Sequence, residues 1–195
     1  FKPRMATAYD EGMTVIYWRS ADSDTWQEVG RFDDLKESGF YPWRIEGEDT
    51  ALVWSRLDGD AAGIYKFDPV SKKVLPEPVI KLNGFDTNAT PEFDSKSRRL
   101  LGVHLATERQ FSYWFDDDLD RLQRSIDKSL PPDRVNRLHC GRCESARYFV
   151  VQSYSDRHPS EYFLFDRSRN SLSRIGAALP WLDEKTQGRR SFHRY

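Results

Sequence analysis

The sequence has few of the features that membrane segments and nucleic-acid surfaces require. No apolar run approaches the ~20 residues that a membrane span needs. The 30 Lys and Arg residues are balanced by 31 Asp and Glu residues, for a net charge of −1. A basic patch for nucleic acid is therefore absent from the composition. We expect neither a membrane nor a nucleic acid as a partner.

The spacing of the 11 glycines excludes several catalytic motifs. No two glycines stand in a G-x-G arrangement, so the dinucleotide fingerprint and the phosphate loop are both absent. One pair, Gly59 and Gly63, is four residues apart, but Ala61 occupies its centre, where a nucleophile elbow needs a serine. We therefore expect no catalytic residue, no cofactor and no metal site in this chain.

What the sequence does have is aromatic residues in short runs between polar turns. Aromatic residues make up 14% of the 195 residues, while hydrophobic residues reach 38% and charged residues 31%. Wide side chains in short runs favour strands over helices. A chain of this length typically buries ~70% of its unfolded surface, which is enough for a real core.

One pattern of alternating bulky residues ending in Asp occurs three times. Its copies are "GIYKFD", "QFSYWFD" and "EYFLFD", which end at Asp68, Asp116 and Asp166, with spacings of 48 and 50 residues. Two further strand-like runs precede each copy, and a weaker run follows the first and third. Each Asp is expected to begin the turn to a fourth strand, where its carboxylate can accept nearby backbone N–H groups.

Four short strands per repeat of forty to fifty residues are the signature of a β-propeller. The sequence thus predicts an all-β fold, a partial β-propeller of about three to four four-stranded antiparallel blades. An ordinary antiparallel sandwich is the alternative. The predicted segments of the propeller are an incomplete blade of two strands at 1–38, blades at 39–85, 86–134 and 135–180, and an exit segment at 181–195.

The third of these segments contains a helical pattern near 117–129. Apolar residues at Leu119, Leu122, Ile126 and Leu130 form one helical stripe. Acidic residues at 116–118 suit a helix N-terminus, and two prolines follow the stripe. We expect a short helix that replaces or extends the outer strand of this blade.

Two groups of residues resemble metal sites without completing one. "HCGRC" offers His139, Cys140 and Cys143, but no second C-x-x-C exists, so a polar turn with Cys140 facing inward or a local disulfide is expected instead. Asp116, Asp118 and Asp120 have the spacing of a calcium loop, yet the loop's glycine position is occupied by arginine. A helix start with solvated acids explains these aspartates.

Arg157 and His158 are the candidate ligand-binding residues. They lie in "SDRHPSE", a predicted loop between the second and third strands of a blade. Loops at one end of a propeller often form a binding rim. A solvent-exposed turn made by Asp156 and Pro159 is the simpler explanation of the same residues.

Three segments resemble one known family. "SIDKSLPPDRVNRL", "YFVVQSYSDRHPSEYFLFDRSRNSLSRIG" and "LPWLDEKTQ" are similar to the propeller of prolyl oligopeptidase-family serine peptidases, closest to bacterial dipeptidyl or acylaminoacyl peptidases. The resemblance covers Leu119 to Tyr195 well and the earlier repeats only as generic blades. It implies that an α/β-hydrolase domain, absent from this chain, carries the catalytic triad and that peptides are the substrate.

The expected function is therefore a non-catalytic, substrate-gating propeller region of a serine peptidase, in a cytoplasmic or periplasmic setting left open by the sequence. The chain begins "FKPRMATAYDEG" without an initiator Met, which fits a processed terminus or a piece of a longer protein equally well. Open faces of an incomplete propeller predict self-association. The alternative is a stand-alone interaction module. A carbohydrate-binding propeller ranks last, because the aromatics fall inside strands rather than on a rim.

Overall fold

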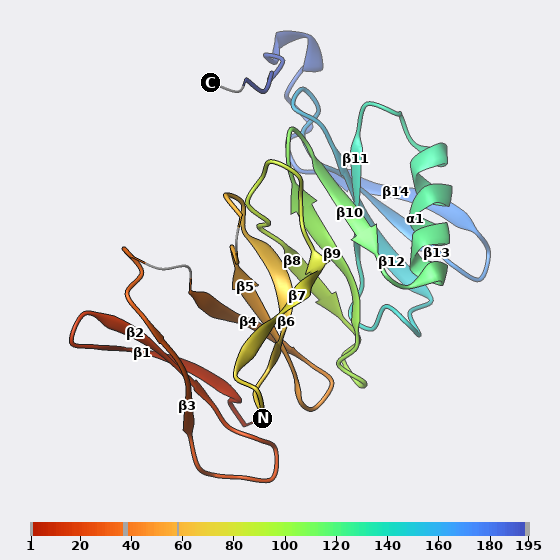
Figure 1. Ribbon diagram of the computed structural model, residues 1–195. Helices are drawn as coiled ribbons and strands as arrows, with labels where there is room; N and C mark the ends of the chain where they lie inside the picture. The colour runs from red at the N-terminus through yellow and green to blue at the C-terminus, as the bar shows by residue number, and fades with distance from the viewer. Residues whose placement is uncertain (1, 37–38, 58, 194–195) are drawn as a thin grey trace. The chain divides into compact units, whose positions relative to one another are not determined.

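The computed structural model of the chain describes residues 2–36, 39–57 and 59–193 (Figure 1). The chain divides into two compact units. Unit 1 comprises Phe1–Asn88 and Ser97–Arg99, and unit 2 comprises Ala89–Lys96 and Leu100–Tyr195. Each unit has a hydrophobic core of its own.

Unit 1 contains two antiparallel sheets that each take consecutive strands. The first sheet has the order β1-β2-β3 and the second β4-β5-β6-β7. Their strands are β1 (Met5–Asp10), β2 (Met13–Trp18), β3 (Gln27–Phe32), β4 (Phe40–Glu46), β5 (Thr50–Ser55), β6 (Gly63–Asp68) and β7 (Lys73–Ile80). Strand β5 is one of the two strand-like runs that the sequence places before "GIYKFD", and β6 is that copy of the repeat itself.

The first sheet has one strand more than the sequence predicts. The prediction placed two strands in residues 1–38, but β1 and β2 pair along their length through a two-residue turn, Glu11-Gly12. Both turn residues have positive φ, 49° and 82°, which matches the twist of a tight hairpin. This Glu-Gly turn was the overlooked signal for β1.

The core of unit 1 is aromatic and draws on both of its sheets. Trp18 and Phe32 of the first sheet belong to the same buried cluster as Phe40, Tyr65 and Phe67 of the second. The rings of Phe40 and Phe67 are stacked with centroids 4.7 Å apart. Such aromatic pairs add about 0.5–1.5 kcal/mol beyond the burial of their area. Burial of this size holds the two sheets of unit 1 together.

Unit 2 contains a three-stranded sheet, a helix and a four-stranded sheet. The sheets have the orders β10-β9-β8 and β11-β12-β13-β14. Their elements are β8 (Thr90–Phe93), β9 (Leu100–Ala106), β10 (Gln110–Trp114), α1 (Asp117–Ser129), β11 (Val135–His139), β12 (Tyr148–Tyr154), β13 (Glu161–Asp166) and β14 (Ser171–Ala177), followed by the short 3₁₀ helix η1 (Glu184–Thr186). In the part of the chain that the structure describes, α1 takes the place of a fourth strand after β10.

Helix α1 confirms the prediction of a helix near 117–129. Asp116 caps it by accepting the backbone N–H groups of Asp118 and Leu119, both at 3.1 Å. The predicted stripe residues Leu119, Leu122 and Ile126 are buried in the core of unit 2. Leu130 is the C-cap residue and packs against the same core.

A buried polar network joins α1 to its neighbouring strands. The indole N–H of Trp114 donates to Gln123 Oε1 at 3.2 Å, and Gln123 Nε2 donates to the carbonyl of Asn136 at 2.8 Å. Gln123 and Asn136 also both donate to Asp127 Oδ1. These bonds compensate for burying the polar groups and set the rotation of the helix on the core.

The two cysteines form a disulfide in the loop between β11 and β12. Cys140 and Cys143 are joined, with Cα atoms 5.1 Å apart. Cys143 is 2% exposed, and the partly buried Cys140 packs against the same core. Of the two alternatives that the sequence left open, the structure has the local disulfide, and Cys143 rather than Cys140 is the more deeply buried.

At the coarse level, the predicted fold class is confirmed. The described residues form four antiparallel sheets of three or four consecutive strands and one α-helix. No helix among them is long and apolar enough to cross a membrane.

Candidate functional site

The predicted rim residues lie in the loop that joins β12 to β13. The Ser155 hydroxyl oxygen accepts the backbone N–H groups of Arg157 at 3.3 Å and His158 at 3.1 Å. The backbone N–H of Ser155 in turn donates to the carbonyl of His158 at 3.0 Å. These bonds hold the loop in a compact turn, from which the side chains of Arg157 and His158 make different contacts.

His158 ties this loop to η1. Its Nε2 contacts the Glu184 carboxylate, and its Nδ1 lies 3.2 Å from the Ser155 hydroxyl. With a neutral ring, the partners assign the proton to Nε2, which donates to the Glu184 carboxylate, while Nδ1 accepts from Ser155. His158 therefore has a structural role in positioning the segment after β14.

Ser155, His158 and Glu184 have the outline of a catalytic triad but not its chemistry. Both lone pairs of the Ser155 oxygen already accept backbone N–H groups, and its proton is directed at His158. A hydroxyl with every hydrogen-bonding position filled is poorly placed to attack a carbonyl. This set therefore stabilises a turn.

A second Ser–His–Glu set lies across three strands of unit 2. Ser112 on β10 contacts His104 Nδ1 at 2.8 Å, and Glu92 on β8 contacts His104 Nε2 at 3.0 Å. His104 and Ser112 are directly opposite each other in the ladder between β9 and β10. A nucleophilic serine usually occupies a strained turn after a strand, whereas Ser112 lies within a regular strand. This set is a cross-strand polar ladder.

Arg157 lines a cleft in unit 2 that we call the arginine cleft. Its volume is about 720 Å³. Its cationic members are Arg109, Arg157, Arg189 and Arg190, and its acidic members are Glu108, Asp133 and Asp156. They come from the turn between β9 and β10, the chain before β11, the loop after β12 and the segment after η1.

Among the described residues, none of the four guanidinium groups of the arginine cleft forms a direct ion pair with a carboxylate, and Arg189 acts on Asp156 only through its charge at longer range. Arg157 donates to a backbone carbonyl, that of Glu184, at 3.3 Å. The backbone N–H of Arg190 donates to Asp156 at 2.8 Å and lowers the pKa of that carboxyl, and the charge of Arg189 lowers it further. Guanidinium groups left in this state bind carboxylates and other planar anions well.

The arginine cleft is adjacent to a second hollow with partly apolar walls. The second hollow, of about 680 Å³, shares Arg109, Gln110 and Val135 with it. Away from the shared residues, its lining is mixed: Phe111, Leu130, Pro131 and Pro132 are apolar, while Arg124, Asp127, Lys128 and Arg134 carry charge. Between the two, Tyr154 donates its hydroxyl hydrogen bond to Gln110. The combined groove offers guanidinium groups at one end and, at the other, apolar side chains with charged ones beside them.

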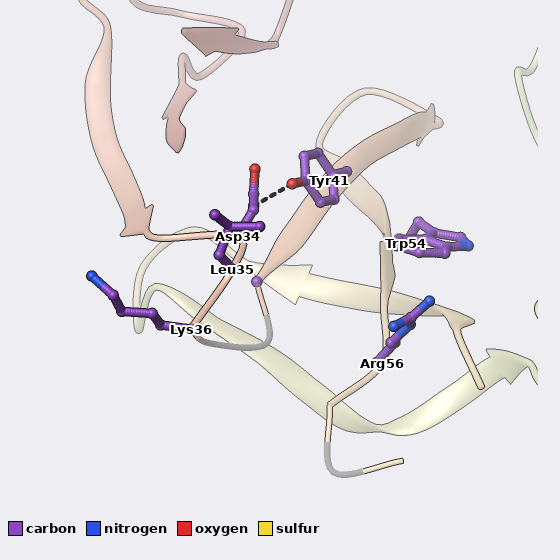
Figure 2. A pocket seen from close by; sticks show the side chains of 7 residues that line it. Asp34, Leu35, Lys36, Tyr41, Trp54 and Arg56 are labelled. Carbon is purple, nitrogen blue, oxygen red and sulfur yellow. Dashed lines mark hydrogen bonds between the residues drawn. The ribbon is translucent and has the colours of Figure 1, made fainter. Parts of the chain in front are cut away.

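Unit 1 has a smaller hollow, of about 440 Å³, beside Tyr41 and Trp54 (Figure 2). Its polar groups already bind one another: Asp34 accepts hydrogen bonds from the Tyr41 hydroxyl and, at 2.6 Å, from Thr14. Burial and the neighbouring carboxylate raise the pKa of Tyr41 to about 12. Figure 2 shows Lys36 extending away from the aromatic rings. A set of groups satisfied in this way stabilises the chain and leaves little for a ligand.

The aspartates with calcium-loop spacing are used by α1 and its surroundings. Asp116 caps the helix, Asp118 pairs with Arg121 and Asp120 pairs with Arg124. Among the described residues, no cluster of three His, Cys, Asp or Glu side chains is arranged to hold a metal ion. The aspartates therefore act as helix-terminal acids.

The sequence identified one of the four cleft arginines. Arg109 precedes Arg157 by 48 positions, and Arg189 and Arg190 follow it by 32 and 33 positions. No motif links them. They meet because the β9–β10 turn and the segment after η1 both reach the loop after β12. To predict that these arginines lie close together, the pairing of the strands would have had to be known from the sequence.

Comparison with known proteins adds no relative. No family model matches the chain, and neither the curated proteins nor the solved structures contain a match. A function for this protein therefore has to be inferred from its own sheets and clefts.

Proposed function

We propose that the chain is a non-catalytic β-propeller region of a serine peptidase, which limits access of peptides to a hydrolase domain outside this chain. The observation that supports this most is repetition. Sheets β4–β7 and β11–β14 have the same consecutive order, and each joins its third strand to its fourth through an Asp-initiated turn. Repeated four-stranded meanders are the unit from which propellers are built.

An exposed apolar sheet face in unit 2 supports the proposal that further propeller blades pack on this sheet. Tyr148, Val150 and Leu164 project from one face of sheet β11–β14 and are 49%, 38% and 38% exposed. Each blade of a propeller packs its faces on adjacent blades, so an end blade presents apolar side chains of this kind. The same face would support self-association when nothing else covers it.

The test begins with the reading frame of the parent gene beyond Tyr195, checked against the intact mass of the native protein. A G-x-S-x-G segment downstream and labelling of the parent by a fluorophosphonate probe are the expected results. The 195-residue chain alone should remain unlabelled. Heat-denatured parent is the matched control for non-specific reaction.

Two serine variants of the parent make the test sharper. Ser112→Ala and Ser155→Ala remove the serines that contact a histidine within the Ser–His–Glu sets. Both variants should keep full labelling, because neither serine is the proposed nucleophile. Loss of labelling in a folded variant would overturn the non-catalytic assignment. A stop codon soon after Tyr195 would instead leave a stand-alone interaction module.

A further inference from the structure

We propose that the arginine cleft binds the carboxylate of an acidic peptide and that the apolar walls beside it contact the neighbouring peptide side chains. This inference deepens the proposed function, since it gives the charge of the peptides that the propeller region admits. It depends on unit 2 alone, whose residues form both hollows of the groove.

The first argument is the contrast between the cleft arginines and other arginines of unit 2. Arg134 and Arg174 both pair with Glu161, and Arg147 pairs with Asp166. None of the four cleft guanidinium groups forms a direct ion pair of this kind among the described residues, although the charge of Arg189 lowers the pKa of Asp156. Fork-shaped donors gathered at one cleft without an acceptor are suited to an incoming carboxylate, which can accept two parallel N–H bonds.

The second argument is the acidic residues, which limit how much negative charge the ligand can carry. Four arginines face three carboxylates in the arginine cleft, so the excess positive charge is small. Asp156 is engaged by the backbone of Arg190, but Glu108 and Asp133 still repel a compact polyanion. A single carboxylate flanked by neutral groups suits this balance better than pyrophosphate or a nucleic acid.

The third argument is the apolar wall, which separates a peptide from a free anion. Phe111, Leu130, Pro131 and Pro132 lie in the hollow that continues from Arg109. An inorganic anion bound at the arginines gains nothing from these side chains, whereas a peptide with apolar residues next to its acid buries surface against them. Gln110 and Tyr154 stand between the two ends and can bond the peptide backbone.

The experiment measures binding of fluorescein-labelled peptides to the 195-residue chain by anisotropy. Three peptides with amidated C-termini differ at one central residue, Glu, Gln or Lys, placed between Leu and Phe. We expect the Glu peptide to bind about tenfold more tightly than the Gln peptide and the Lys peptide to bind most weakly. Raising NaCl from about 50 to about 300 mM should reduce the preference for Glu, because exposed charges are screened.

Variants identify the groups responsible. Arg109→Gln and Arg157→Gln should each weaken the Glu peptide about threefold to tenfold and leave the Gln peptide unchanged. Arg121→Gln is the matched control, since Arg121 is an exposed arginine of α1 outside both hollows. Circular dichroism of each variant checks that the fold is retained, and the charge series on the unaltered chain needs no variant.

Several outcomes would overturn the inference. Equal affinity for the Glu, Gln and Lys peptides would remove the role of charge, and full binding by the Arg109→Gln, Arg157→Gln double variant would remove the role of this cleft. Competition by phosphate at the concentration of the Glu peptide, together with no loss when Leu and Phe become Ala, would make it a site for small anions. All of these results are independent of whether a hydrolase domain follows, so failure here is distinct from failure of the proposed function.

Discussion

Sheets β4–β7 and β11–β14 join their third and fourth strands through the same kind of turn, but the Asp that begins the turn has different partners in the two sheets. In each, a four-residue loop follows the terminal Asp, and the fourth loop residue has positive φ: Lys72 at 55° and Asn170 at 49°. Asp68 accepts the backbone N–H of Val70 at 3.0 Å, as Asp166 accepts that of Ser168 at 2.9 Å. The expectation that these aspartates begin the turn to a fourth strand is confirmed at both positions.

The difference lies in what else each carboxylate binds. Asp68 is satisfied within its own turn, with Ser71 as its side-chain partner. Asp166 also pairs with Arg147, across the sheet at the start of β12, at 3.0 Å. One local motif can therefore serve as a turn in one sheet and as a cross-strand tie in another. The repeated sequence determines the turn, while the surrounding residues determine how much the Asp side chain contributes to stability.

The largest expected effect tests whether the two cores are independent. Phe149 in unit 2 is fully buried and Phe67 in unit 1 is 4% exposed. Phe149→Ala and Phe67→Ala should each lower the free energy of unfolding by about 3–5 kcal/mol, through lost burial and a residual cavity. Hydrogen-exchange mass spectrometry should show faster exchange chiefly in the altered unit. Equal acceleration in both units would mean that they unfold as one.

Acid should separate the two turn aspartates. The Arg147 guanidinium, then Ser168, holds the pKa of Asp166 below its usual value, while Ser71 lowers the pKa of Asp68. A lowered folded-state pKa stabilises the fold above the unfolded value of about 3.9, and that stability is lost as the pH falls below it. We therefore measure the urea concentration at the midpoint of unfolding as the pH is lowered. Asp166→Asn should reduce the dependence of this midpoint on acid pH more than Asp68→Asn does. Identical limbs would show that Arg147 adds nothing.

The third Asp of the repeat offers a test of context. Asp116 ends the same pattern as Asp68 and Asp166 but caps α1 instead of a hairpin turn. Asp116→Ala should cost about 1 kcal/mol of stability, the usual value of an N-cap. Urea unfolding measures the loss, and Asp116→Asn, which keeps a capping oxygen, should recover most of it. A loss that Asn fails to recover would point to the charge rather than the cap.

The smallest effect is expected from exchanging the positive-φ residues of the two turns. Asn tolerates the left-handed conformation better than Lys does. Asn170→Lys should therefore destabilise the protein by about 0.5–1 kcal/mol. Lys72→Asn should gain less, because it loses the bond from Lys72 Nζ to the carbonyl of Glu28 at 2.9 Å. Thermal unfolding reports both, and effects of the opposite sign would mean that the two turns are not equivalent.

Much of the fold follows from sequence patterns because those patterns are local. The continuous apolar run of β5 and the stripe on α1 are each visible within one element, so a strand at β5 and the buried Leu119 could be assigned directly. The first strand could not, since "MATAYD" has little apolar contrast and only its pairing with β2 makes it a strand. Local periodicity therefore predicts elements with a strong apolar pattern, while strands with a weak pattern, such as β1, form through pairing with a neighbouring strand.

The site was predicted less well than the fold. Arg157 was found because its loop follows a recognisable strand, but the role of His158 depends on Glu184, which is 26 positions further along. Nothing in the sequence marks that contact. Clefts are formed by loops whose ends are set by several strands, so their members become visible only once the sheets are assembled.

The Cys140–Cys143 disulfide has a consequence for where this fold can exist in its complete form. Such bonds persist in oxidising surroundings and are reduced by cytosolic thiols. Material made in a reducing cytoplasm would carry two thiols within the β11–β12 loop. The redox history of a sample is thus part of its covalent structure, and intact mass with and without a reductant reads it directly.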